Sequence, residues 1–154
     1  MSRFILSTDS CCDLAKSEMR EREISYINLS FNAEENGEFK IFYDDFHSYD
    51  EYVEFYNKMR NGFAPKTTQL TAEELYEYFK SIRREGKDIL HVCLSSGLSG
   101  TYHCAQAAAK RMLDDFGVKV IPVDSLAATV GQKRVVLKAQ ELRDLDFETE
   151  RAAE

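Results

Sequence analysis

The stretch from residue 95 to residue 101 carries the densest set of polar side chains in the sequence, Ser95-Ser96-Gly97-Leu98-Ser99-Gly100-Thr101. It follows an apolar run at residues 89–94 and precedes an alanine-rich segment typical of a helix. The first N–H groups of a helix lack intrahelical partners and form the positive end of its dipole. Hydroxyl groups placed there can hold a phosphate or a carboxylate without any cationic side chain. The sequence therefore predicts an anion site formed by Ser95, Ser96, Ser99, Gly100 and Thr101.

Two further polar turns follow apolar runs in the same way. Asp9-Ser10 follows the run at residues 3–8, and Asp124-Ser125 follows the run at residues 118–123. In parallel sheets, ligands bind outside the carboxyl ends of the strands. We expect these turns to support the same site. Asp9 and Asp124 are also a candidate metal pair, although Asp followed by Ser is an ordinary helix start; the favoured expectation is a site without metal.

The serine-rich turn also has a hydrolytic interpretation. Its segment Gly97-Leu98-Ser99-Gly100-Thr101 differs from the G-x-S-x-G nucleophile motif only in the threonine at the final position. His103 follows Ser99 by four residues, so the two would have to pair within one helical turn, with a third group orienting the imidazole. We expect no catalytic residue and keep a small Ser-dependent hydrolase as the alternative.

The elements that position these turns follow from the hydrophobic pattern. Three short apolar runs, each closed by a hydroxyl-rich turn that opens a helix, are typical of parallel βαβ units. The expected fold class is α/β, three-layer α/β/α with a mainly parallel sheet. Alternating runs that begin at Ile27 and resume at Phe39 surround Asn36-Gly37, which predicts an inserted β-hairpin.

Two capping boxes mark further helices. Ser48 precedes Glu51 and Thr71 precedes Glu74 at the spacing in which each side chain satisfies an N–H group at a helix start. These helices should end near glycines 62 and 86, and a last helix should run to about residue 142. We expect one domain over residues 1–143, followed at 144–154 by a charged tail or a truncated connection.

Composition narrows the class of protein. The chain has 154 residues, of which 44% are hydrophobic and 31% charged, as in a globular domain. Its net charge of −7 disfavours nucleic acid and anionic membrane surfaces as partners. The start of the chain lacks a signal-peptide pattern, and the four cysteines have no zinc spacing, so we expect a cytoplasmic protein with reduced thiols. Nucleotide-binding glycine motifs are absent from the sequence, and we expect no cofactor.

Four motifs together resemble the DegV family in type, order and spacing. They are Ser7-Thr8-Asp9-Ser10-x-x-Asp13-Leu14, Pro65-Lys66-Thr67-Thr68-Gln69, Leu94-Ser95-Ser96-Gly97-Leu98-Ser99-Gly100-Thr101-Tyr102 and Val123-Asp124-Ser125. The resemblance implies binding of a long-chain fatty acid whose carboxylate contacts Thr67 and Ser99, with Ser95 and Ser96 beside them and Thr68 in a supporting turn. It also implies a fatty acid kinase as partner, which performs the phosphoryl chemistry.

The same resemblance implies a two-domain binding site. Members of the family hold the acyl tail between two domains and are about twice as long as this chain. We therefore expect weak binding by one domain alone, and a homo-oligomer in which a second copy covers the carboxyl ends of the strands. A domain that serves only for association is the remaining alternative.

Overall fold

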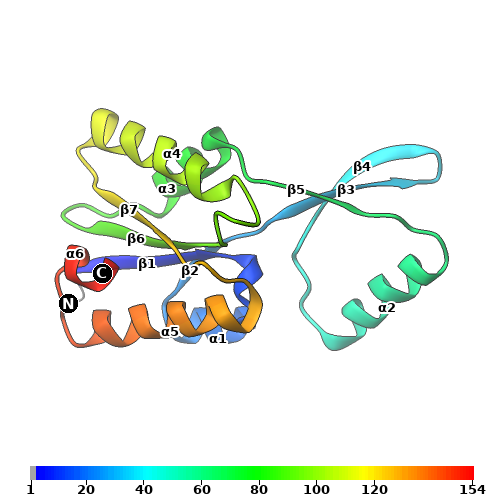
Figure 1. The fold of residues 1–154 in the computed structure, drawn as a ribbon, viewed down its shortest axis with the longest axis horizontal. Helices are drawn as coiled ribbons and strands as arrows, with labels where there is room; N and C mark the ends of the chain where they lie inside the picture. Colours follow the sequence, from blue (N-terminus) through cyan, green and yellow to red (C-terminus); the bar gives the residue numbers. More distant parts are fainter. Residues whose placement is uncertain (1–2) are drawn as a thin grey trace. The chain divides into compact units, whose positions relative to one another are not determined.

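The structure is a computed structural model that describes residues 3–154 in two compact units (Figure 1). The first unit comprises residues 3–27 together with Leu70–Glu154, and the second comprises Asn28–Gln69. Along the chain, the second unit is inserted between Ile27 and Leu70 of the first. Each unit has its own sheet.

The sheet of the first unit is parallel throughout. Its four strands are β1 (Phe4–Asp9), β2 (Ser25–Ile27), β6 (Asp88–Cys93) and β7 (Val120–Asp124), in the order β2-β1-β6-β7. The predicted parallel sheet and α/β class are therefore confirmed. All carboxyl ends of a parallel sheet meet at one edge, so the turns after β1, β6 and β7 lie at that edge.

Helices cover both faces of this sheet. In Figure 1, α1 (Lys16–Glu21) and α5 (Thr129–Asp144) lie on one side, and α3 (Ala72–Ile82) and α4 (Thr101–Phe116) on the other. The expected three layers are thus present. The short helix η1 (Ser10–Cys12) follows β1, and the segment predicted as a tail contains α6 (Thr149–Ala153), in which the Thr149 side chain is buried.

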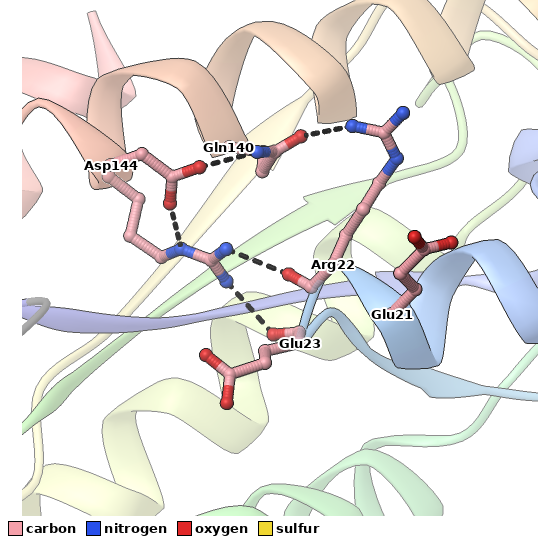
Figure 2. A pocket seen from close by; sticks show the side chains of 6 residues that line it. Glu21, Arg22, Glu23, Gln140 and Asp144 are labelled. Atoms are coloured by element: carbon pink, nitrogen blue, oxygen red, sulfur yellow. Dashed lines mark hydrogen bonds and ion pairs between the residues drawn. The ribbon is translucent and has the colours of Figure 1, made fainter.

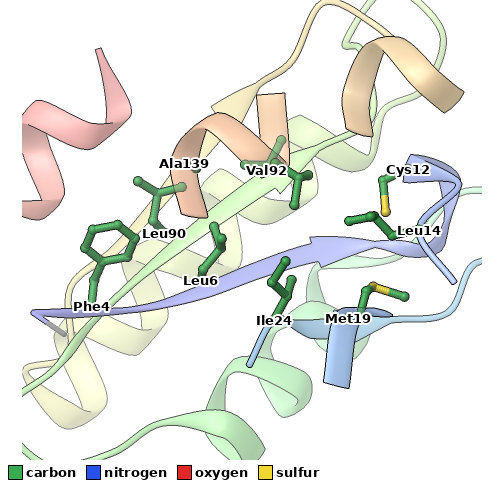
Figure 3. Packing of buried hydrophobic residues seen from close by; sticks show 10 residues of the cluster. Phe4, Leu6, Cys12, Leu14, Met19, Ile24, Leu90, Val92 and Ala139 are labelled. Atoms are coloured by element: carbon green, nitrogen blue, oxygen red, sulfur yellow. The ribbon is translucent and has the colours of Figure 1, made fainter. Parts of the chain in front are cut away.

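The alternation of side chains along each strand divides the core between the two faces. Leu6 and Leu90 are neighbours in the register and pack with Val136 of α5 in one buried cluster (Figure 3). The next residue on each strand, Ser7 and His91, faces the other layer, where His91 contacts Phe79 of α3. The second face therefore carries polar groups inside an apolar layer.

The second unit is a small antiparallel sheet with one helix. Its strands β3 (Ser30–Glu35), β4 (Glu38–Tyr43) and β5 (Lys66–Thr68) lie in the order β4-β3-β5, and its helix is α2 (Tyr49–Arg60). The predicted hairpin is confirmed: Asn36 and Gly37 both have positive φ, 57° and 81°, as a two-residue turn requires. Stacked Phe31 and Phe42, with centroids 5.3 Å apart, form its core with Phe55 of α2.

One strand of the predicted hairpin was placed wrongly. The alternating run expected from Ile27 to Phe31 is not one strand, because Ile27 ends β2 and pairs in parallel with β1, whereas Phe31 belongs to β3. Alternation alone does not show that the chain passes from one sheet to another. The three-residue strand β5 was not predicted.

Both helices predicted from capping boxes are present. Thr71 Oγ1 accepts the Glu74 N–H at 3.2 Å, and the Glu74 carboxylate accepts the Thr71 N–H at 2.8 Å. At α2, Ser48 Oγ accepts the Glu51 N–H at 3.3 Å, while the Glu51 carboxylate accepts the N–H of His47. The capping box at Ser48 is therefore incomplete, because Glu51 accepts the N–H of the residue before Ser48 instead of the Ser48 N–H.

Candidate functional site

The turn after β6 is shaped by Ser95. Its carbonyl accepts the N–H groups of Leu98 and Ser99 at 3.0 and 3.1 Å, and its hydroxyl accepts the Gly97 N–H at 3.2 Å. Its own N–H donates to the carbonyl of Ala127 at 2.9 Å. Ser95 is 7% exposed, so its hydroxyl builds the turn rather than facing solvent.

The start of α4 carries the hydroxyl groups best placed for a ligand. The capping position is Gly100, which supplies no side chain. Ser99 Oγ accepts the Thr101 N–H at 3.2 Å and lies 2.9 Å from the hydroxyl of buried Thr101. The first helical bond runs from the Cys104 N–H to the Gly100 carbonyl, so the N–H groups of residues 102 and 103 have no acceptor within the helix. Half-buried Ser99 and these N–H groups can together bind an anion.

Asp124 joins the turn after β7 to the serine-rich turn. Its Oδ1 accepts the N–H groups of Ser96 and Leu126, each at 3.0 Å. Burial alone would raise the pKa of this carboxyl, but hydrogen bonds from Ser96 and from the Leu126 N–H outweigh burial, and the net pKa is lowered. Ser125 Oγ bonds to the carbonyl and N–H of Ala127 within the same turn. These residues hold two neighbouring turns in one arrangement.

Asp9 has the same function for the turn after β1, and it is fully buried. Its Oδ2 accepts the Leu94 N–H at 2.7 Å, and its Oδ1 accepts the N–H of Cys11 at 3.0 Å. The amide of Gln132, also fully buried, donates to the same Oδ1 at 2.9 Å. Ser10 lies between Asp9 and Cys11 as the first residue of η1. The three turns are thereby linked to one another and to α5.

Gln132 was not predicted as a site residue. It follows a turn in which two non-glycine residues, Leu126 and Thr129, have positive φ, and no local motif marks it. A glutamine four residues before Val136 and seven before Ala139, at the spacing of one helix face, is the sequence signal of a buried polar contact.

Apolar side chains surround the polar turns at this edge of the sheet. Leu98, Leu126 and Val130 are 71%, 77% and 62% exposed, respectively, and all lie in the turns or at the first residues of α5. The helix α5 also begins without a side-chain cap. The edge therefore combines N–H groups that lack an acceptor within their helix with exposed apolar side chains, a combination that suits an amphipathic anion.

The predicted residues Thr67 and Thr68 belong to the second unit. Both lie on β5, where Thr68 Oγ1 donates to the Ser30 carbonyl at 3.1 Å and bonds to its hydroxyl at 2.6 Å. Thr67 is exposed and pairs with Phe31 in the register. The other predicted residues belong to the first unit.

The hydrolytic alternative requires Ser99 to pair with His103, but the two side chains have other hydrogen-bond partners. Ser99 Oγ bonds to Thr101, and the ring of His103 lies 3.3 Å from Gln106 Oε1. A different Ser-His contact lies on the face of the sheet that α3 covers. There, Ser7 Oγ lies 2.9 Å from His91 Nδ1 and 2.7 Å from the Tyr78 hydroxyl. Ser7 and His91 are fully buried. Burial lowers the pKa of His91 to about 3 and raises that of Tyr78, so both stay neutral.

A polar pocket lies at the opposite end of α5 (Figure 2). Arg143 donates there to the carbonyls of Arg22 and Glu23 at 2.8 and 2.9 Å and to the Asp144 carboxylate at 3.1 Å. Arg22 in turn donates to Gln140 Oε1 at 2.8 Å. These arginines close the C-terminal turn of α1 and are engaged within the protein, so this pocket is not the predicted anion site.

Residues 3–154, which the structure describes, also bear on membrane-spanning and metal-binding functions. In that range no helix combines the length and the apolar character needed to span a bilayer. The same range contains no group of three or more His, Cys, Asp or Glu side chains placed to hold a metal ion. All four cysteines are free, and two of them, Cys12 and Cys93, are buried.

Comparison with known proteins gives one consistent result. The family model described as "Uncharacterised protein, DegV family" matches residues 3–153. A DegV domain-containing protein of Clostridium perfringens is 34% identical over 146 residues, which cover 93% of this chain and 48% of that protein. One of Staphylococcus aureus is 33% identical over 131 residues, covering 85% and 44%.

Solved structures agree with this result. A DegV family protein of Thermus thermophilus, described by its fatty acid binding, superimposes with a TM-score of 0.80 at 29% identity over 97% of this chain and 50% of its own. A protein of Thermotoga maritima, described as revealing a fatty acid binding function, gives 0.79 at 28% identity over 99% and 53%. The chain thus spans about half the length of the proteins that it matches.

Proposed function

The chain belongs to the DegV family, and we propose on that basis that it binds a long-chain fatty acid, with the carboxylate held at the start of α4. The main support for this proposal is the start of α4, where the capping position is a glycine. The glycine at position 100 offers no side chain, and the hydroxyl of Ser99 stands beside N–H groups that have no acceptor in the helix. A carboxylate would accept those hydrogen bonds.

The site is suited to a carboxylate because its donors are neutral and already positioned. Ser95 and Asp124 hold the turn by hydrogen bonds to backbone N–H groups, so Ser99 needs little reorganisation to meet a ligand. Half-buried Ser96 belongs to the same polar surface, and fully buried Thr101 supports that surface through its hydroxyl contact with Ser99.

The acyl tail supplies most of the affinity in this proposal. Burial of each methylene group is worth about 0.8 kcal/mol, so a long chain contributes on the order of 10 kcal/mol before the costs of binding. The exposed side chains of Leu98, Leu126 and Val130 offer apolar surface next to the head-group donors. The hydroxyl cluster then fixes the direction of the fatty acid more than its affinity.

The relatives supply the ligand class. Two proteins that share 28–29% identity with this chain are described as fatty-acid-binding, and each is about twice as long. We infer that a second wall for the acyl tail comes from outside the residues described here. By the same resemblance, the protein acts as a cytoplasmic carrier that presents the carboxylate to a fatty acid kinase and has no catalytic residue of its own.

Native mass spectrometry of gently purified protein tests this proposal. We expect a co-purified fatty acid mass or, after addition of palmitate, a complex that Ser99→Ala weakens. Apo protein alone, with no complex and no thermal shift on addition of palmitate, would contradict binding by this chain.

A further inference from the structure

The strand β4 exposes both its edge and one of its faces. It is the outer strand in the order β4-β3-β5, so one side of it has no neighbouring strand in that sheet. Its side chains Phe39, Ile41 and Tyr43 are 80%, 66% and 58% exposed. Three large apolar side chains on consecutive positions of one face are unusual for a surface strand.

The same three residues direct backbone groups to the open edge. Glu35 and Glu38 flank the two-residue turn and form the first pair of the hairpin. In such a hairpin that first pair exchanges hydrogen bonds, and alternate residues of β4 after it point their N–H and C=O groups away from β3. Those alternate residues are 39, 41 and 43. The Tyr43 carbonyl accepts the Asp45 N–H at 2.8 Å and retains a second lone pair.

The opposite face of the strand is already covered. Phe42 pairs with Phe31, and both lie in the aromatic core with Phe55 of α2. Cross-strand neighbours share a face, so Ile41 lies beside Asn32 and Phe39 beside Glu34 on the side away from that core. The open face is therefore apolar on β4 and polar on β3.

We propose that β4 is a docking edge for a second copy of this chain, which pairs antiparallel through its own β4. Charge decides the register. With Phe42 opposite the second copy's Phe42, Ile41 faces the second copy's Tyr43, and Lys40 faces the second copy's Asp44. By two-fold symmetry the Ile41–Tyr43 and Lys40–Asp44 contacts each occur twice, whereas Phe42 meets its own copy once, on the axis.

Other registers are less favourable. A shift that places Ile41 opposite itself brings Glu38 opposite Asp44, two like charges, and a further shift brings Lys40 opposite Lys40. A register centred on Phe39 pairs Glu38 with Lys40 but requires Gly37, a turn residue with positive φ, to act as strand. Among these registers, only the proposed one places opposite charges, Lys40 and Asp44, across from each other and also keeps its hydrogen-bonded pairs within β4. Those pairs are the two Ile41–Tyr43 pairs of the dimer.

Sedimentation equilibrium of the full chain, from micromolar to submillimolar concentration, tests this surface. We expect a dimer that Ile41→Lys weakens by at least about tenfold, equivalent to about 1.4 kcal/mol. The matched control is Leu113→Lys, because Leu113 is 54% exposed on α4 of the other unit. A monomer at all concentrations, or a dimer that survives Ile41→Lys and dissociates in the control, overturns the proposal.

A charge exchange tests the register. We expect Lys40→Asp and Asp44→Lys each to weaken the dimer and the double variant to restore it, with circular dichroism melting to verify that each variant is folded. Lys40 also pairs with Glu35 at 3.1 Å within the chain, so Asp44→Lys with the double variant is the more informative comparison. A double variant no tighter than Asp44→Lys alone overturns this register.

Discussion

The amide of Gln132 donates to the carboxylate of Asp9 at 2.9 Å, and both side chains are fully buried. This bond joins α5 to the end of β1, where Asp9 also accepts the Leu94 N–H from the end of β6. One carboxylate thus links three elements at the edge that carries the candidate site. The arrangement of that edge depends on this bond.

Replacement of Gln132 should therefore destabilise the fold more than its polarity suggests. We expect Gln132→Leu, which keeps most of the volume, to lower the free energy of unfolding by about 2 kcal/mol, because a buried carboxylate loses a donor. Gln132→Glu should cost more at neutral pH, since two carboxyl groups would then meet. Urea unfolding measures both, with exposed Gln106→Leu as control. A loss no larger than that of the control would show that the bond contributes nothing.

Substitutions of Asp124 test whether its hydrogen bonds, rather than its charge, hold the turn. Asp124→Asn keeps an oxygen acceptor for the N–H groups of Ser96 and Leu126, whereas Asp124→Ala leaves both without it. We expect the alanine variant to be less stable than the asparagine variant by about 1–3 kcal/mol, measured by urea unfolding. Equal stabilities would mean that these bonds do not hold the turn.

His91 should make stability depend on pH. Burial lowers its folded-state pKa to about 3, below the ordinary value of 6.5, so on acidification the unfolded chain takes up a proton first. The free energy of unfolding should fall by up to about 1.4 kcal/mol per pH unit from this group as the pH falls from about 6.5 towards 5. His91→Asn should remove that slope and exposed His103→Asn should keep it. An unchanged slope in His91→Asn would contradict this assignment.

Ser99 should affect binding rather than stability. We expect Ser99→Ala to weaken binding of a fatty acid by about 1.5–3 kcal/mol, the value of a hydrogen bond to a charged group, with at most about 1 kcal/mol lost from stability. Isothermal titration calorimetry with the exposed Ser81→Ala variant as control measures the difference. Equal affinity of Ser99→Ala and wild type would remove Ser99 from the head-group site.

The sequence predicts local features of this protein better than long-range ones. Apolar runs, the Asn36-Gly37 turn and the capping box at Thr71 each depend on neighbouring residues, and the structure contains all the elements that they predict. The bond between Asp9 and Gln132 joins residues 123 positions apart, and no local pattern announces it. For the same reason the alternating pattern predicts one strand where the structure has β2 and β3, because alternation indicates a strand but not which sheet the strand joins.

The candidate site likewise has features that the sequence predicts and features that only the structure shows. Ser95, Ser99 and Asp124 could be assigned to one edge of the sheet because parallel strands must end together. Their separate functions could not, since only the structure shows that Ser95 and Asp124 bond to backbone groups while Ser99 stands at the helix start. Thr67 was grouped with them by family resemblance alone, and it belongs to the other unit.

Amide chemical shifts of isotope-labelled protein titrated with decanoate would show whether a carboxylate binds at the start of α4. Decanol is the matched probe, with equal chain length and no carboxylate. We predict that decanoate shifts the amides of Ser99, Tyr102 and His103, and that decanol shifts apolar neighbours such as Leu98 and Leu126 without those three. Identical shifts with both probes, or decanoate shifts confined to other residues, would contradict a carboxylate site at the start of α4.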